Sequence, residues 1–392
     1  MKRLVCLVLV LSFVFVGGIS IFAENGEKTE AENYSINEAS IEISAKSAVL
    51  MEGNTGKIIY AKNESEALSP ASVTKIMTLL LVMEALDDGA FSLADKVNVS
   101  AYAASMGGSQ VFLKEGEEIT VEDLIKCTVI ASANDAAVAL AELVCGSESA
   151  FVGKMNKRAG ELGMVSAKFE NVTGLDDTAE NHLLSALDIA IMSRELLKHG
   201  EIKKYTTLWQ DTIRDGEFTL TNTNRLVRFY DGCTGLKTGS TAKAGFCMSA
   251  TAERNGMELI AVIMGSDTRD ERNAEARALL DYGFSNYALY RAESSEIGEI
   301  KISGGSKESV KLYSKEGSFL VNKGDLDDIK KQINLPSALN APVSKDEKLG
   351  AVEFFVGDKL LGECEIYSRE NVGNLSFYHL YLTMLKKLLG RG

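Results

Sequence analysis

Histidine is scarce in this chain of 392 residues, which contains three: His182, His199 and His379. A metal site needs ligands at characteristic short spacings, and a serine–histidine pair needs a pattern that ties the two residues together. These three histidines are scattered and show neither signal. We therefore treat them as structural and expect no metal ion and no other cofactor.

Cysteines are also few, and their pattern excludes a disulfide-dependent scaffold. Five lie beyond the first 23 residues, namely Cys127, Cys145, Cys233, Cys247 and Cys364. An odd number leaves at least one thiol free, and no spacing is typical of a metal site. Cys233 and Cys247 could face each other across a sheet. A chain of this length buries a large core without such a bond, so five buried thiols is the favoured interpretation.

Positive charge is in deficit. The sequence has 42 lysines and arginines against 55 aspartates and glutamates, a formal net charge of −13. Such an acidic chain repels nucleic acid and anionic membranes unless a local basic patch intervenes. Its 45% hydrophobic and 25% charged residues are ordinary for a folded protein, which excludes a disordered or collagen-like chain.

A long apolar run occurs at the N-terminus. Lys2 and Arg3 precede the almost continuous apolar residues 4–21, and Ala23 precedes a polar, acidic segment. This pattern predicts a signal peptide over residues 1–23, cleaved after Ala23. An uncleaved membrane anchor is the alternative, because the run is nearly long enough to span a bilayer. In either case we expect the rest of the chain to be exported and to lie outside the cytoplasm.

The pattern beyond the N-terminus predicts a lead-in and two domains. Residues 24–45 are polar without a sustained period and are predicted to be flexible. Residues 46–291 begin with a hairpin, continue through helices and return to apolar strands. The predicted helices include residues 121–130, 135–144 and 184–197, and the predicted strands residues 231–240, 245–252 and 257–265. Strands on both sides of a helical block favour an α/β (α+β) fold, an antiparallel sheet covered by helices. Short alternating segments over residues 292–370 predict a small β-rich C-terminal domain.

An amphipathic helix is predicted over residues 374–392. Tyr378, Tyr381, Leu385 and Leu389 recur at helical spacing, and the charged side chains of this segment are lysine or arginine. On an acidic protein, a basic amphipathic end is typical of a helix that lies in a membrane interface. A helix docked on the protein's own surface is the alternative. We expect the protein to be peripheral on the outer face of the cytoplasmic membrane.

Two Ser-x-x-Lys patterns occur, Ser72/Lys75 and Ser240/Lys243, so the pattern alone decides nothing. The second pair lies among predicted strands. The first pair opens a long helix that is apolar on nearly every side and must therefore be buried. That context favours Ser72 and Lys75, which lie on the same face of the helix.

The predicted start of this helix favours chemistry. Ser69 at the N-cap and Pro70 at the first helical position are a strong helix start, which places Ser72 near the partial positive charge of the N-terminus. Lys75 is then desolvated, which lowers its pKa and lets a neutral amine accept the Ser72 proton. A lysine that snorkels from a helix end is the alternative.

Two further elements are candidates for the same site. Ser132-Ala133-Asn134 lies between two predicted helices, where taken alone it would be a helix-capping turn. Lys237-Thr238-Gly239 lies in an apolar strand, which suggests that a ligand approaches the strand edge. A lysine that protects an edge strand from aggregation is the simpler alternative.

In this order the three elements match the motif set of penicillin-binding proteins and class A β-lactamases. The run over residues 231–245, Asp-Gly-Cys-Thr-Gly-Leu-Lys-Thr-Gly-Ser-Thr-Ala-Lys-Ala-Gly, closely resembles the D-alanyl-D-alanine carboxypeptidases among the low-molecular-mass penicillin-binding proteins. The resemblance implies a β-lactamase/transpeptidase-like fold, with residues 46–291 as a serine D,D-peptidase domain. The β-rich residues and the amphipathic tail match the family's remaining parts.

By position, the resemblance makes Ser72 the nucleophile and Lys75 its general base. Ser132 then belongs to the proton relay, and Asn134 holds the substrate's amide. The second motif has Ala133 where the general form has Asp, a difference at a spacer position.

The third motif and one arginine complete the implied substrate-binding site. Lys237 supplies positive potential and helps to relay protons, and Thr238, followed by Gly239, binds the substrate's carboxylate. Backbone N–H groups of the nucleophile and of Ser240 form the oxyanion hole. Arg272 matches an additional anchor for that carboxylate. Three cationic side chains suit a substrate that ends in a carboxylate.

The implied reaction removes the terminal D-alanine from peptidoglycan stem peptides that end in D-Ala-D-Ala, through an acyl-enzyme on Ser72, with β-lactams as covalent inhibitors. An endopeptidase of peptidoglycan cross-links, a class A β-lactamase and a non-catalytic wall-binding module are the alternatives. The β-lactamase needs a glutamate that activates water, and residues 171–177, the comparable region, show no Glu-x-x-Leu-Asn segment.

Overall fold

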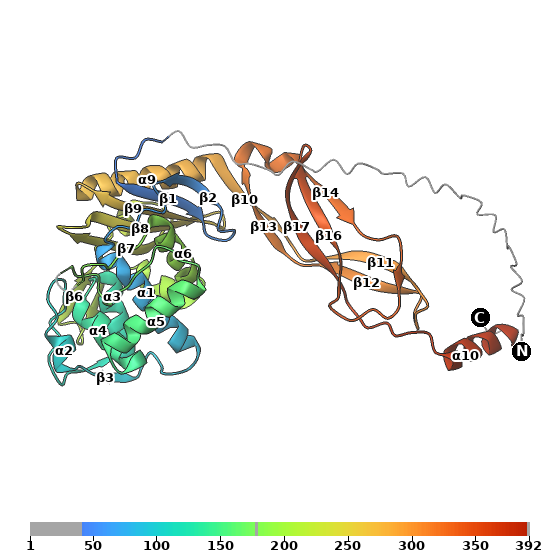
Figure 1. Cartoon of the computed structure of the whole chain (residues 1–392), viewed down its shortest axis with the longest axis horizontal. Coiled ribbons are helices and arrows are strands. Elements are labelled where there is room, and N and C mark those ends of the chain that lie inside the picture. The colour runs from blue at the N-terminus through green and yellow to red at the C-terminus, as the bar shows by residue number, and fades with distance from the viewer. Residues whose placement is uncertain (1–40, 177–178, 390–392) are drawn as a thin grey trace, which may run out of the picture.

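The computed structural model describes residues 41–176 and 179–389. The predicted signal peptide and residues 24–40 of the predicted lead-in lie outside these residues. Within them, a body of helices and strands is followed by a β-rich part (Figure 1). The predicted fold class is confirmed.

The body is built on an antiparallel sheet, whose strands among the described residues run in the order β2-β1-β9-β8-β7. These strands are β1 (Ser47–Glu52), β2 (Ile58–Lys62), β7 (Cys233–Thr241), β8 (Gly245–Arg254) and β9 (Met257–Ser266). β1 pairs with β9 along its whole length, from Ser47 opposite Met264 to Glu52 opposite Leu259. The first hairpin therefore belongs to the same sheet as strands that come much later in the chain.

Helices cover both faces of this sheet (Figure 1). One face packs against α9 (Arg269–Asn286). The other face carries α1 (Lys75–Asp87), α3 (Val121–Ile130), α4 (Asn134–Cys145), α5 (Glu148–Glu161) and α6 (Ala186–Leu197). Shorter elements complete the body: β3 (Lys96–Asn98), α2 (Ala101–Ala104), β4 (Glu118–Thr120), η2 (Gly200–Ile202), α7 (Lys203–Thr206), β5 (Gln210–Ile213), β6 (Phe218–Thr221) and α8 (Leu226–Phe229).

Helix α1 lies in the larger core. Every side chain from Ile76 to Met83 is at most 2% exposed, so the predicted buried helix is confirmed. It begins differently from the prediction, because Pro70 is the N-cap of a 3-10 turn, η1 (Ala71–Thr74), which leads into α1. Ser69 is not the cap: its Oγ donates to Asp176 Oδ1 at 2.9 Å. A carboxylate from a distant loop attracts this hydroxyl, and local spacing does not reveal such a partner.

The β-rich part has a core of its own. It begins with β10 (Tyr287–Ala292), which follows α9 directly and pairs with β13 (Gly317–Asn322). A second sheet has the strand order β14-β16-β17-β12-β11-β15. Its strands are β11 (Ser295–Ser303), β12 (Ser309–Ser314), β14 (Ile329–Asn334), β15 (Leu339–Asn340), β16 (Lys348–Val356) and β17 (Lys359–Ser368), with the 3-10 turn η3 (Lys323–Asp328) before β14. A separate core, which includes Leu312 and Ile366, supports a second folding unit here.

The last described helix is α10 (Phe377–Leu388), which lies beyond the second sheet in Figure 1. Its Phe377, Tyr378 and Met384 side chains are 84%, 69% and 60% exposed, so these side chains are not docked on the protein's own surface. Among the residues described, no single helix is both long and apolar enough to cross a bilayer. The pair α4 and α5 passes that test together despite a bend of 81° between them.

All five cysteines in the described part of the chain are free thiols. Cys233 lies opposite Ala252 and Cys247 opposite Gly239, so the two are at opposite ends of the β7–β8 ladder and cannot pair. The expectation of five buried thiols is wrong for two of them, because Cys145 and Cys233 are partly exposed.

The end of the predicted lead-in is packed against the body. Ile43 and Ala45 are buried in the core beneath α9. Glu275 Oε1 accepts hydrogen bonds from Ser44 N, Ser44 Oγ and Ala45 N at 2.6, 2.7 and 2.9 Å. Its Oε2 accepts from Ser266 Oγ at 2.9 Å. One carboxylate on α9 therefore fastens the incoming chain to the sheet.

We expect Glu275→Gln to lower the free energy of unfolding by about 1–3 kcal/mol, because an amide replaces a carboxylate that accepts several charge-assisted hydrogen bonds. Urea unfolding of the purified variant measures this loss. Glu293→Gln changes an exposed glutamate and is the control, with an expected change below about 0.5 kcal/mol. Equal stability of the Glu275→Gln variant and the wild type would contradict the fastening role.

Candidate active site

The serine and lysine of the first motif are in hydrogen-bond contact. Ser72, in turn η1, is partly exposed, whereas Lys75 is fully buried at the start of α1. Lys75 Nζ lies 2.9 Å from Ser72 Oγ. Two carbonyl oxygens complete its surroundings, Asn134 Oδ1 at 2.6 Å and the backbone oxygen of Thr173 at 2.9 Å. A buried lysine with three inward partners is not a lysine that snorkels to solvent.

The environment of Lys75 disfavours its charged form. Burial holds the pKa of its amine well below the usual range, and the positive charge of Lys237 lowers it further. Asp135 acts in the opposite direction but is outweighed. The carboxylate of Asp135 is itself occupied by the backbone N–H groups of Val111 and Leu113. A neutral amine beside Ser72 Oγ can accept that hydroxyl's proton.

The second motif supplies side chains to the site instead of capping a helix. The N-cap of α4 is Ala133, and no side chain caps that end. Ser132 adopts a positive φ of 60°, an uncommon conformation for a residue other than glycine, and its Oγ accepts from Lys237 Nζ at 2.8 Å. Asn134 Nδ2 donates to Gly107 O at 2.7 Å, which orients Oδ1 toward Lys75. The capping-turn alternative is therefore wrong.

The third motif lies on strand β7, directly beside the turn that carries Ser72. Lys237 and Thr238 are 1% and 6% exposed. A Cβ atom at Gly239 would lie 2.8 Å from Pro70 O and 2.9 Å from the Ser72 nitrogen, so only glycine lets β7 pass this close. Burial and then the charge of Arg272 lower the pKa of Lys237 to about 7.

Arg272 is brought close to this strand by the first turn of α9. It is 3% exposed, and its Nη1 donates to Cys247 O at 3.4 Å, on the residue opposite Gly239.

Thr238 Oγ1 lies 2.8 Å from Thr223 Oγ1, a contact that the sequence did not suggest. Thr173 was also missed, because its contribution is a backbone carbonyl that no side-chain pattern marks.

The second Ser-x-x-Lys pair does not form a comparable arrangement. Ser240 is exposed at the end of β7 and lines a cavity of about 520 Å³ together with Lys46, Lys243 and Phe246. Lys243 Nζ donates to Glu180 O at 2.9 Å. The contact between Ser72 and Lys75 thus has no counterpart in the hydrogen bonds described for Ser240 and Lys243, although Ser240 remains beside the site through its backbone.

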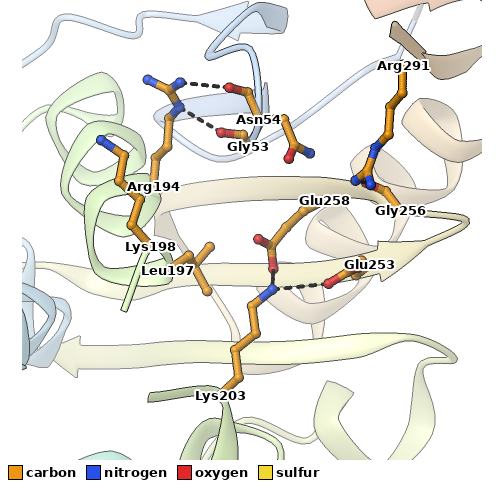
Figure 2. Close-up of a pocket in the computed structure, with 10 residues that line it drawn as sticks. All are labelled: Gly53, Asn54, Arg194, Leu197, Lys198, Lys203, Glu253, Gly256, Glu258 and Arg291. Atoms are coloured by element: carbon orange, nitrogen blue, oxygen red, sulfur yellow. Dashed lines mark hydrogen bonds and ion pairs between the residues drawn. The ribbon is translucent and has the colours of Figure 1, made fainter. Parts of the chain in front are cut away.

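Another polar cavity, of about 350 Å³, is separate from these motifs (Figure 2). This cavity lies at the turn between β8 and β9, next to Gly256. The residues of the third motif lie instead on the edge strand β7. Lys203 is paired there with Glu253 and Glu258 at 3.1 and 2.8 Å, and Arg194 donates to the carbonyl of Gly53 at 2.7 Å. None of the predicted site residues lines this cavity.

Within the described ranges, no cluster of histidine, cysteine and acidic residues is arranged to hold a metal ion.

Family models match most of the chain. Residues 32–268 match the model described as D-alanyl-D-alanine carboxypeptidase. The chain belongs to this family. Residues 284–374 match the model of the penicillin-binding protein 5 C-terminal domain. The resemblance carried by the three motifs is confirmed.

The relatives of this carboxypeptidase family member align with it over nearly the whole of their own lengths. D-alanyl-D-alanine carboxypeptidase DacF of Bacillus subtilis is 43% identical over 398 residues, which cover 100% of this chain and 98% of that protein. DacD of Escherichia coli is 35% identical, over 89% of this chain and 92% of that protein. Penicillin-binding protein 5 of Haemophilus influenzae superposes with a TM-score of 0.78 at 31% identity, covering 86% of this chain and 100% of that one. Penicillin-binding protein D2 of Listeria monocytogenes, solved in its ampicillin-bound form, has a TM-score of 0.58 at 29% identity, covering 63% and 100%.

We expect covalent labelling of this protein by a fluorescent penicillin to slow as the pH rises through about 7, because Lys237 loses its positive charge there and attracts the penicillin carboxylate less. Arg272→Gln should move this decline to higher pH, since removing a neighbouring positive charge raises the pKa of Lys237. Arg272→Lys keeps the charge and is the control. The measurement is the labelling rate constant over a pH series, and a decline at the same pH in the Arg272→Gln variant would disprove the assignment.

Proposed function

We propose that the protein is a serine-type carboxypeptidase that removes the terminal D-alanine from peptidoglycan stem peptides ending in D-Ala-D-Ala. The observation that carries the proposal is the contact between Ser72 Oγ and the buried amine of Lys75, whose pKa lies well below its usual range. Its membership in the carboxypeptidase family, with DacF as a relative of full length, supports the same reaction.

In the proposed acylation, Lys75 accepts the Ser72 proton while Ser72 Oγ bonds to the carbonyl carbon of the penultimate D-alanine. Negative charge develops on the carbonyl oxygen, which lies between the backbone N–H groups of Ser72 and Ser240. The close approach of Gly239 to the Ser72 nitrogen supports this placement, because Ser240 follows directly. The carbon–nitrogen bond then breaks, and Ser132 passes the proton held by Lys75 to the departing amine. Water later hydrolyses the ester and restores Ser72.

The terminal carboxylate of the substrate is placed beside Thr238, where Lys237 and Arg272 supply positive charge. Asn134 has a narrower role than the motif implies. Both ends of its amide are engaged within the protein, one with Lys75 and one with Gly107. We therefore infer that Asn134 mainly positions the base, and that a contact to the substrate's amide requires its Nδ2 to leave Gly107.

A class A β-lactamase activity is disfavoured by the loop beside Lys75. The acidic residue at its start, Glu170, is paired with Lys168 Nζ at 3.0 Å and accepts from Asn181 N at 3.0 Å. Because both oxygens of the Glu170 carboxylate are engaged with Lys168 and Asn181, this carboxylate does not face Ser72 as a water-activating base would. The loop reaches the site through the carbonyl of Thr173, which cannot act as a general base for deacylation.

We expect the wild-type protein to release D-alanine from diacetyl-L-Lys-D-Ala-D-Ala, and Ser72→Ala to lose this activity by about 10⁴-fold or more, because no other nucleophile is activated at the site. Lys243→Ala, in the second Ser-x-x-Lys pair, is the matched control and should retain activity within about twofold. Free D-alanine is the quantity to measure.

Three other outcomes would redirect the proposal. No release by the wild type would exclude the carboxypeptidase. Faster cleavage of a cross-linked dimer of stem peptides than of the monomer would favour the endopeptidase. Rapid turnover of benzylpenicillin, in place of a long-lived adduct on Ser72, would favour the β-lactamase.

We further propose that the exported protein is held on the outer face of the cytoplasmic membrane by α10. Its exposed Phe377, Tyr381 and Leu388 side chains offer apolar area to a bilayer interface, and the lysines of this segment suit anionic lipid. The alignment with the DacF relative covers 100% of this chain and therefore includes this segment. Residues 1–23 are proposed as the signal for export.

Removing residues 375–392 should release the protein from anionic vesicles in a sedimentation assay and leave D-alanine release within about twofold, since α10 and α1 lie on opposite sides of the β-rich part in Figure 1. Phe377→Ser should weaken vesicle binding by itself. Ile333→Ser, at a 53% exposed apolar side chain of β14, is the matched control and should bind normally. Unchanged recovery of the truncated protein with vesicles would exclude the anchor.

A further inference from the structure

His182 lies buried beside the nucleophile turn, with 2% of its surface exposed. The backbone next to it is fixed on both sides. Leu183 exchanges two hydrogen bonds with Lys168, at 2.8 and 3.0 Å, and Leu184 pairs with Leu68, shortly before turn η1. These backbone hydrogen bonds therefore fix the position of the imidazole close to the turn that carries Ser72.

The two ring nitrogens of His182 bind different segments. Nδ1 faces the backbone N–H groups of Glu170 at 3.1 Å and Asn171 at 3.4 Å. A backbone N–H can only donate, so Nδ1 carries no proton and the ring proton resides on Nε2. Nε2 then donates to Thr74 Oγ1 at 2.8 Å, and that hydroxyl donates to Ala71 O at 2.8 Å. Burial lowers the pKa of this histidine to about 4, so the neutral tautomer persists at neutral pH.

Both contacts end beside Lys75. Thr74 directly precedes it in the chain, and the loop that begins at Glu170 leads to Thr173, whose carbonyl accepts from the Lys75 amine at 2.9 Å. Asn171 Oδ1 stiffens this loop by accepting from the N–H groups of Thr173 and Gly174 at 3.2 and 2.7 Å. The imidazole thus links the loop to the turn.

The loop and the turn are also in backbone contact. A Cβ atom at Gly174, where φ is +79°, would lie 1.8 Å from Ala71 O and 2.7 Å from Thr74 Oγ1. No other residue fits there without moving one segment away from the other. A small shift between them would therefore displace the Thr173 carbonyl from Lys75.

The position of that carbonyl decides where the Lys75 lone pair points. A neutral amine has two N–H bonds and one lone pair, and Asn134 Oδ1 and Thr173 O can only accept. At 2.6 and 2.9 Å these two oxygens take both N–H bonds. The lone pair is left for the remaining neighbour, the hydroxyl of Ser72 at 2.9 Å. Loss of the Thr173 contact would free the amine to turn its lone pair elsewhere.

We propose that His182 is a positioning residue, which locks the loop of residues 170–174 against the nucleophile turn so that Thr173 O aims the Lys75 lone pair at Ser72. The proposal rests on the proposed role of Lys75 as the general base. His182 touches neither the substrate nor the reacting atoms, so it acts through Thr74 and the loop alone.

The test exchanges the histidine for a ring without hydrogen-bonding nitrogens. For His182→Phe we expect kcat for D-alanine release, and the rate of acylation by benzylpenicillin, to fall about 100-fold, with KM within about twofold, because a misaimed base slows the chemical step without removing a substrate contact. His199→Phe makes the same exchange at the far end of α1, where His199 contacts Asp87, and should keep the wild-type kcat.

Two further variants separate positioning from general destabilisation. His182→Gln offers an amide N–H to Thr74 and should recover about tenfold of the lost kcat. Thr74→Val breaks the same link from its other end and should lower kcat in the same direction at unchanged KM. Because both changes break one link, the double variant His182→Phe/Thr74→Val should be no slower than the slower single variant.

A folded His182→Phe protein with the wild-type kcat overturns the proposal, as do losses that multiply in the double variant. If His182→Phe does not fold, Thr74→Val decides alone: a lower kcat at unchanged KM supports the link, and an unchanged kcat overturns it. If the wild type neither releases D-alanine nor is acylated, the proposed function itself fails. An active wild type with an equally active His182→Phe variant removes the positioning role only.

Discussion

Burying an amine costs free energy unless each of its protons and its lone pair has a hydrogen-bond partner. The fully buried amine of Lys75 imposes this requirement on the rest of the structure. Its Nζ reaches Ser72, Asn134 and Thr173, which belong to a turn, a helix and a loop that are distant in the chain. Burial, together with the nearby charge of Lys237, favours the neutral form that can serve as a base. The sheet and its helices must hold these segments within hydrogen-bond range before the lysine can act.

Close backbone packing provides that precision. The turn that carries Ser72 is enclosed on one side by the loop at Gly174 and on the other by β7 at Gly239, and a Cβ atom at either glycine would collide with the turn. Ser132, in the α3–α4 connection, adopts a positive φ, and its Oγ accepts from Lys237 Nζ on β7 at 2.8 Å. Backbones in mutual contact leave a reacting group little freedom to drift, which is how a rigid scaffold preorganises a site.

Electrostatics follow from the same enclosure. Arg272 lowers the pKa of Lys237, and Lys237 in turn lowers the pKa of Lys75, while burial is the larger cause at each lysine. A chain with a net charge of −13 thus contains a local group of three basic side chains, Lys75, Lys237 and Arg272. In the proposed mechanism such a group would attract a carboxylate-ended ligand and leave its innermost member free to accept a proton, so that one arrangement would serve both binding and base catalysis.

Local patterns were sufficient for much of this protein. Apolar periodicity and turn residues predicted the buried α1, the antiparallel sheet and the β-rich part. The buried helix favoured Ser72 and Lys75 over the second Ser-x-x-Lys pair, and the resemblance of the three motifs to a known family added Ser132 and Lys237. They failed for Ser69, which binds Asp176 instead of capping a helix, and for the Thr173 carbonyl, the Thr223 hydroxyl and the imidazole of His182. A backbone carbonyl has no residue-type signature, and a lone threonine or histidine has many ordinary uses. The sequence by itself determined which side chains are available for the chemistry. Only the tertiary structure decided which oxygens surround Lys75 and where its lone pair points, because those depend on distances between segments that no local pattern encodes.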